Sequence, residues 1–155
     1  MTDEYDKFSF STTDVDLLLH ATEDKNLVFD KIEQILFIPK DIFNIVELEG
    51  HWGNPIISVS CTLDKLKSHD LIFKIFSSLN FNDKEKLTDN LEDYMDEKYY
   101  LYMRIDKQHL CKNKISLDPT DDSIKLRFKP SKKLVTKDQR KIIPKYYRRL
   151  LLLQE

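Results

Sequence analysis

The chain has very few of the residues on which several common kinds of site depend. Gly50 and Gly53 are the only two glycines among 155 residues. A glycine-rich phosphate loop, a GxGxxG dinucleotide fingerprint and a GxSxG nucleophile elbow are all absent. The two cysteines, Cys61 and Cys111, provide neither a disulfide framework nor a CxxC metal pair. The longest aliphatic run is Leu150–Leu153, far short of the roughly 20 residues that span a membrane. We therefore expect a soluble, cytoplasmic protein with no membrane partner.

Charge is balanced over the whole chain but not along its length. The formal net charge is −2, yet residues 125–149 contain eleven Lys or Arg residues and a single acid, Asp138. Residues 83–97 instead hold seven acids against two lysines. An acidic body with a basic C-terminal segment favours a polyanionic partner. A solvated tail that balances its own acidic helix explains the same pattern equally well.

Hydrophobic periodicity predicts one domain of short strands and amphipathic helices. Strands are predicted over residues 14–21, 43–49, 57–63, 99–106, 114–117 and 123–129. Helices are predicted after the N-cap candidates Thr22, Ser68 and Asn82 or Asp83, and from Pro144 onward. The second and third strands form a hairpin whose loop holds both glycines, where positive φ or close backbone approach is required.

This order of elements predicts an α+β fold. Hairpin-connected strands and segregated helices suit a two-layer domain on a mostly antiparallel sheet, with the helices on one face. We assign residues 1–130 to this domain. Residues 131–155 are a basic C-terminal extension, expected to be helical and packed on the domain or on a partner.

Sites for catalysis or metal binding find little support. Ser68–Asp70 is a run of sequence neighbours whose side chains diverge around a helix start instead of converging as a triad. His109 and Cys111 have no second ligand pair at zinc-site spacing. Acids such as Asp14 and Asp106 are typical of strand ends and turns. We predict no catalytic residues, no metal and no cofactor, hence a protein that is not an enzyme.

A binding surface has better support. Two strands turn aromatic and cationic side chains away from the core, namely Tyr100, Tyr102, Arg104, Lys125, Arg127 and Lys129. Rings can stack on unpaired bases while cations bind phosphates. The same face also fits a dimer interface built on the tyrosines, or an exposed face without function. The C-terminal residues 132–149 are either a basic arm that binds phosphates or a packed helix with a charged outer side.

Three motifs resemble those of an archaeal family of RNA-binding, exosome-associated proteins. His20–Asp24 (HATED) resembles its strand-to-helix entry, and Glu49–Ile56 (EGHWGNPI) is similar to its E-G-H-x-G-N-P-I hairpin. Tyr102–Gln108 (YMRIDKQ) resembles its R-x-D-K-Q strand end. The motifs occur in the same order and spacing, and the resemblance covers Val15–Phe128.

The resemblance implies a fold like that of the large-subunit ribosomal protein that binds 5S RNA. It also implies a homodimer with a role in RNA binding or processing near the archaeal exosome. The candidate contacts that it adds are His51, Asn54, Arg104, Lys107 and Gln108. A structural role for Lys107 and Gln108 in fixing the strand end stays open. A dimeric protein–protein adaptor with little direct RNA contact is the alternative function.

Overall fold

The computed structural model describes residues 9–50, 53–117, 120, 122–131 and 140–152. The strands are β1 (Phe10–His20), β2 (Asn44–Glu49), β3 (Pro55–Leu63), β4 (Leu101–Asp106) and β5 (Ser123–Pro130). The helices are α1 (Lys25–Leu36), α2 (Lys65–Ser78), α3 (Phe81–Asp89), α4 (Lys107–Cys111) and α6 (Ile143–Leu152), with 3-10 turns η2 (Lys40–Ile42) and η4 (Leu91–Tyr94).

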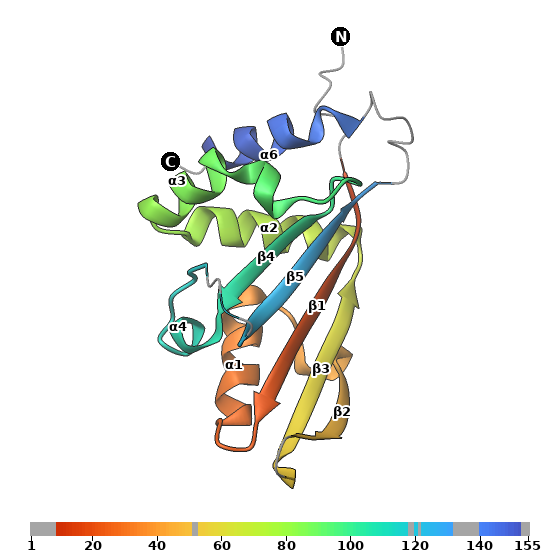
Figure 1. The fold of residues 1–155 in the computed structure, drawn as a ribbon, viewed down its shortest axis with the longest axis vertical. Helices are drawn as coiled ribbons and strands as arrows, with labels where there is room; N and C mark the ends of the chain where they lie inside the picture. Colours follow the sequence, from red (N-terminus) through yellow and green to blue (C-terminus); the bar gives the residue numbers. More distant parts are fainter. Residues whose placement is uncertain (1–8, 51–52, 118–119, 121, 132–139, 153–155) are drawn as a thin grey trace.

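The five strands form one antiparallel sheet in the order β2-β3-β1-β5-β4. The helices gather on one side of this sheet (Figure 1), and the prediction of a two-layer α+β fold is confirmed. The N-terminal strand β1 is central, and β5 from the far end of the chain pairs with it. This register sets Asp14 opposite Arg127 and Asp16 opposite Lys125. Acids of the first strand therefore lie beside cations of the last.

Strands β1, β3, β4 and β5 alternate between a buried and an open face. Leu101, Met103 and Ile105 of β4 are at most 1% exposed, whereas Tyr102 between them is 42% exposed. This alternation follows from the period of two in an extended chain, and it confirms the predicted inward and outward sets of β4 and β5. On the buried face, the hydroxyl of Thr13 donates to Ser68 Oγ at 2.6 Å, which joins β1 to α2.

The N-caps of α1, α2 and α3 lie two to four residues away from the predicted caps. Asp24, Asp64 and Asn80 are the N-caps, each accepting a hydrogen bond from the backbone N–H three residues later. That geometry satisfies an N–H group that the first helical turn leaves unpaired. Ser68, predicted as a cap, is instead buried inside α2. The side chain of Glu23 accepts from His20 N–H and closes the β1–α1 turn.

The predicted strand at residues 114–117 is wrong. Only a single bridge joins Leu117 to Ile105, and a short helix, α4, begins directly after β4. Asp106 caps it by accepting from His109 N–H at 2.9 Å. Asp106 therefore both ends β4 and begins α4. The chain turns into this helix instead of continuing to the predicted strand.

Both glycines of the β2–β3 hairpin are required by the backbone, as predicted. A Cβ on Gly50 would lie 2.8 Å from the carbonyl oxygen of Asn54, to which Gly50 N–H donates. Gly53 has φ +74°, a conformation that residues with a Cβ rarely adopt.

Candidate nucleic-acid interface

The open face of β4 and β5 presents an aromatic ring beside two cations. Tyr102, Arg104 and Lys125 are all exposed there, and the register pairs Arg104 with Lys125 and Tyr102 with Arg127. Neighbouring strands lie about 5 Å apart, so these side chains form one continuous surface. The structure thus brings together five predicted contact residues: Tyr102, Arg104, Lys125, Arg127 and Lys129. We call this set the basic–aromatic face.

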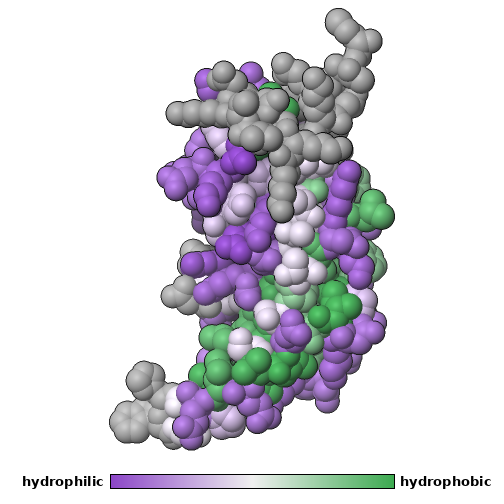
Figure 2. All heavy atoms as spheres, turned by 90° about the vertical axis from the view of Figure 1, so that its right-hand side faces the viewer, coloured by the Kyte–Doolittle hydropathy of each residue, from purple (hydrophilic) through white to green (hydrophobic). Residues whose placement is uncertain are grey.

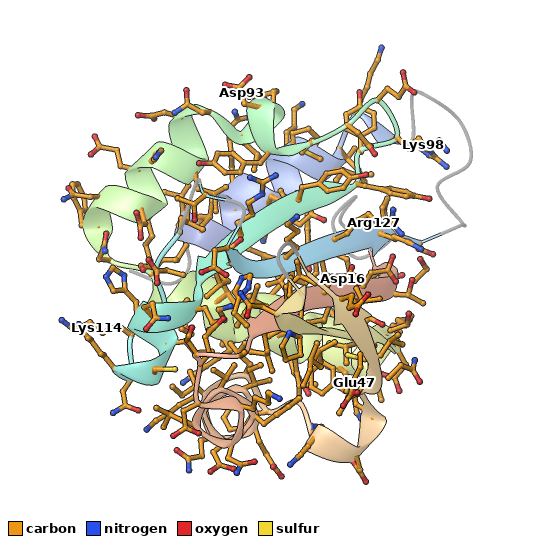
Figure 3. The ribbon with its side chains drawn as sticks, turned by 60° about the horizontal axis from the view of Figure 1, so that its bottom comes forward. Asp16, Glu47, Asp93, Lys98, Lys114 and Arg127 are labelled. Atoms are coloured by element: carbon orange, nitrogen blue, oxygen red, sulfur yellow. The ribbon has the colours of Figure 1, made fainter. Side chains whose placement is uncertain are left out.

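Asp14 of β1 partly neutralises the basic–aromatic face. Its carboxylate forms an ion pair with Arg127 and lies 3.2 Å from Lys129 Nζ. Burial raises the pKa of Asp14, but hydrogen bonds from Arg127, Lys129 and Thr62 outweigh it and hold the pKa below 3.8. Figure 3 shows Asp16 and Arg127 on these adjacent strands. Lys125 forms no ion pair with a carboxylate in the described part of the chain, so its charge is available to a ligand.

Asp96 positions the tyrosine. The Tyr102 hydroxyl donates to Asp96 Oδ2 at 2.9 Å, and the other carboxylate oxygen accepts from Tyr100 N–H at 3.0 Å. Partial burial and the bond to Asp96 raise the pKa of Tyr102. The ring is therefore held by its hydroxyl and remains 42% exposed. Tyr100 lies just before β4 and is half-buried.

Lys107 requires a correction, because its side chain is only 1% exposed. Its ammonium donates to the carbonyl of Leu18 at 2.7 Å, to Glu23 Oε1 at 2.8 Å and to Asp122 Oδ1 at 2.9 Å. An amino group with three protein acceptors is fully satisfied and is not available to a phosphate. The geometry supports the structural alternative, in which Lys107 fixes the end of β4.

The two carboxylates that contact Lys107 also belong to a group of side chains that could hold a metal ion. His20, Glu23 and Asp122 place ligand atoms within 4.8 Å of one another. Both carboxylates already face the Lys107 ammonium, which supplies the positive charge that a metal ion would bring. We interpret the cluster as a lysine-centred ion network.

The remaining predicted contacts lie apart from the basic–aromatic face. Gln108 is exposed on the first turn of α4. Asn54 is exposed in the β2–β3 hairpin, and β3 and β1 separate this edge from β5. His51 lies outside the described residues. The structure therefore does not gather the motif residues into a single site.

The opposite edge of the sheet exposes apolar side chains together with Glu47 and Glu49. Ile45, Val46 and Leu48 of β2 are each about half exposed, at 49%, 54% and 47%. Figure 2 views the molecule from the β2–β3 side and shows hydrophobic side chains over its lower part, with hydrophilic ones above. Sequence reasoning recognised the alternation in β2 but not that the whole strand is an exposed sheet edge.

Sequence reasoning also did not place acids of β1 beside the basic–aromatic face. Asp14 and Asp16 alternate with the buried residues of β1, and this alternation was the available signal that they face outward. Their effect on the cations became visible only once β1 and β5 were known to pair. No local pattern specifies that pairing across more than a hundred residues.

These features define a class: a two-layer α+β protein whose open sheet face presents aromatic rings and cations. In the described part of the chain, none of the helices is long and apolar enough to pass through a bilayer. The profile of a family described as RNA binding matches residues 13–130. The chain belongs to this RNA-binding family.

Individual relatives agree with the family assignment. The chain is 30% identical to RNA-binding protein PAB1135 from Pyrococcus abyssi, over 72% of this chain and 75% of the relative. It is 28% identical to the uncharacterized protein MJ0213 from Methanocaldococcus jannaschii, over 72% and 78% of the two chains.

Solved structures show the same fold. The DUF54 protein Mth689 from Methanothermobacter thermautotrophicus matches with a TM-score of 0.72 at 23% identity, over 92% of this chain and 98% of that one. The DUF54 protein AF2318 from Archaeglobus fulgidus matches with a TM-score of 0.68 at 27% identity, over 91% and 99%.

Proposed function

We propose that the chain is a non-enzymatic RNA-binding protein that contacts RNA through the basic–aromatic face. The observation that carries the proposal is the exposed Tyr102 ring beside Arg104 and Lys125, on a sheet face that no described helix covers. A ring held in place stacks on an unpaired base at low entropic cost, and each such stack contributes about 1–3 kcal/mol. Membership of the RNA-binding family and the name of the P. abyssi relative support the same partner.

The cellular role that we propose is an accessory one in RNA processing, near the archaeal exosome, as the motif resemblance implies. The basic C-terminal segment is proposed to add phosphate contacts, because residues 137–149 contain six cations and one acid, although Arg148 among them already pairs with Glu92. Such contacts are independent of sequence and weaken as salt rises.

Filter binding tests the proposal with single-stranded and structured RNA over a salt series. Tyr102→Phe keeps the ring but loses its bond to Asp96, so it is expected to weaken binding less than Tyr102→Ala, which should lose about 5-fold or more, the equivalent of one base stack. Arg104→Ala and Lys125→Ala should reduce the salt dependence, since each removes a phosphate contact. A Kd weaker than about 10⁻⁴ M at moderate salt, the weak end of non-specific binding, would exclude RNA as the partner.

A protein–protein adaptor is the second candidate, and the apolar β2 edge is the observation that favours it. An exposed edge strand presents unpaired backbone groups to another chain, and Val46 and Leu48 add apolar area. We propose that a second copy pairs here to form a homodimer. Val46→Lys should then shift the molecular mass in solution toward the monomer. A partner recovered from nuclease-treated extract, together with absent RNA binding, would favour the adaptor function.

A further inference from the structure

The helical side of the molecule has a second concentration of positive charge. A cavity of about 590 Å³ lies where the end of α1, the end of α2 and the turn after α4 meet, and none of the eleven described residues that line it is acidic. Its cations are Lys74, Lys112 and Lys114, with His109 beside them. Figure 3 shows Lys114 extending outward from the turn after α4. A cavity of this composition suits an anion.

Local backbone geometry builds the cationic wall. The carbonyl of His109 accepts from both Lys112 N–H and Lys114 N–H, each at 2.9 Å, so one tight turn presents two lysines to the same cavity. Lys31 Nζ adds a further cation by donating to Asn113 Oδ1 at 2.6 Å. No described carboxylate forms an ion pair with Lys112 or Lys114, unlike Arg127 and Lys129 on the sheet face.

An aromatic groove adjoins this cavity. It has a volume of about 450 Å³ and shares Lys74 with the cationic cavity, and its lining includes one acid, Asp70. Phe37 and Phe73 line it and are 62% and 56% exposed, and Lys74 Nζ lies 5.7 Å from the centre of the Phe37 ring. Phe37 also has φ +57°, a conformation that is unfavourable for any residue with a Cβ. This left-handed residue ends α1 and leaves the Phe37 ring exposed beside Lys74.

We propose that the cavity and the groove together, here called the helical-side groove, bind a single strand of RNA. Phosphates lie against Lys74, Lys112 and Lys114, and a base stacks on Phe37 or Phe73. This inference rests on the proposed RNA-binding function but concerns a surface on the other side of the sheet. Rings adjoining an excess of cations are the combination that proteins use for single strands, and the lysines of the groove outnumber its one lining acid, Asp70. An acidic peptide is the competing occupant.

The test measures binding of a fluorescent oligouridine to the full chain over a salt series. For a single strand, each lost phosphate contact reduces the slope of log K against log salt by about 0.7. The double variant Lys112→Ala/Lys114→Ala is therefore expected to reduce the magnitude of this salt slope by about 1.4. The matched control is Lys65→Ala/Lys86→Ala, which removes the same charge from exposed positions that do not line the groove. Phe73→Ala is expected to weaken binding about 5-fold or more, and Phe73→Tyr to retain it.

The outcomes separate this proposal from the one on which it rests. Equal slopes for the two double variants would overturn the groove while leaving RNA binding intact. The groove would also be overturned if Tyr102→Ala lost RNA binding while every groove variant bound like the wild type. RNA would then be assigned to the sheet face alone. Stronger binding of polyglutamate than of oligouridine, lost in the Lys112/Lys114 variant, would identify a peptide site. No binding by the wild-type chain would overturn the proposed function itself.

Discussion

At the scale of single residues, Lys107 connects three separate parts of the chain. Its ammonium contacts a carbonyl of β1, Glu23 in the β1–α1 turn and Asp122 before β5. The residue therefore joins two of the family-like motifs, HATED and RIDKQ. The contacts of Lys107 explain this lysine by packing and charge without any contact to RNA.

Replacement of Lys107 is expected to destabilise the fold. Lys107→Met leaves the buried Glu23 carboxylate without its partner, and breaking a buried pair costs about 3 kcal/mol or more. Urea unfolding of the variant measures this loss. Gln108→Met is the matched control, because Gln108 is the exposed neighbour and surface changes stay within about 0.5 kcal/mol. Unchanged stability with weaker RNA binding would restore Lys107 as a contact residue.

At the scale of elements, Asp14 connects the central strand β1 to β5. Its carboxylate accepts from Arg127 Nε at 2.9 Å and from Thr62 Oγ1 of β3 at 3.1 Å. One side chain therefore bonds to both neighbouring strands. It also limits how much positive charge the basic–aromatic face presents.

Asp14 is expected to make stability depend on pH. Its pKa in the folded protein is held below 3.8, so its contribution is fully present above the unfolded pKa and is lost as pH falls through the folded value. Asp14→Asn should lower the free energy of unfolding by about 1 kcal/mol at pH 7. This loss is small for a hydrogen bond between charged groups because the Arg127 side chain is 41% exposed to solvent. In urea unfolding, the difference from wild type should shrink below about pH 4. A difference that persists at pH 2 would contradict this.

At the scale of the whole molecule, α6 completes the core although it follows the matched family region. Tyr147 is 0% exposed, and its ring centre lies 6.0 Å from that of Phe10 and 6.3 Å from that of Phe76. Arg148 bonds to Glu92 at 2.8 Å, which links the basic end of the chain to its acidic stretch. The basic segment is therefore partly neutralised by the protein's own acids.

Removal of the Tyr147 ring tests this role of α6. Tyr147→Ala is expected to cost about 3–5 kcal/mol, the range for large-to-small changes in a core. Thermal and urea unfolding report the loss, and Lys145→Ala on the exposed side of the same helix serves as control. Near-equal stability of the two variants would mean that the domain is stable without this contact.

Most of the fold followed from the sequence because its signals are local. A period of two or 3.6 depends only on which neighbouring residues are apolar, so the strands β3, β4 and β5 and the helices α1, α2, α3 and α6 were predicted within a few residues, whereas α4 was not predicted. The predicted starts of the helices were less accurate, because several adjacent residues can each serve as the N-cap. The path of the backbone determines which of them does. Lys107 could not be predicted as buried, because its acceptors lie 15 to 89 residues away along the chain.

The sequence by itself determined the α+β class, the two glycines of the hairpin and the outward set of Tyr102, Arg104 and Lys125. Only the tertiary structure decided which charges remain available. The pairing of β1 with β5 places Asp14 against Arg127 and Lys129, and the turn after α4 places Lys112 and Lys114 beside α2. Electrostatic interactions depend on distance in space, and the ion pair of Asp14 with Arg127 joins residues 113 positions apart along the chain.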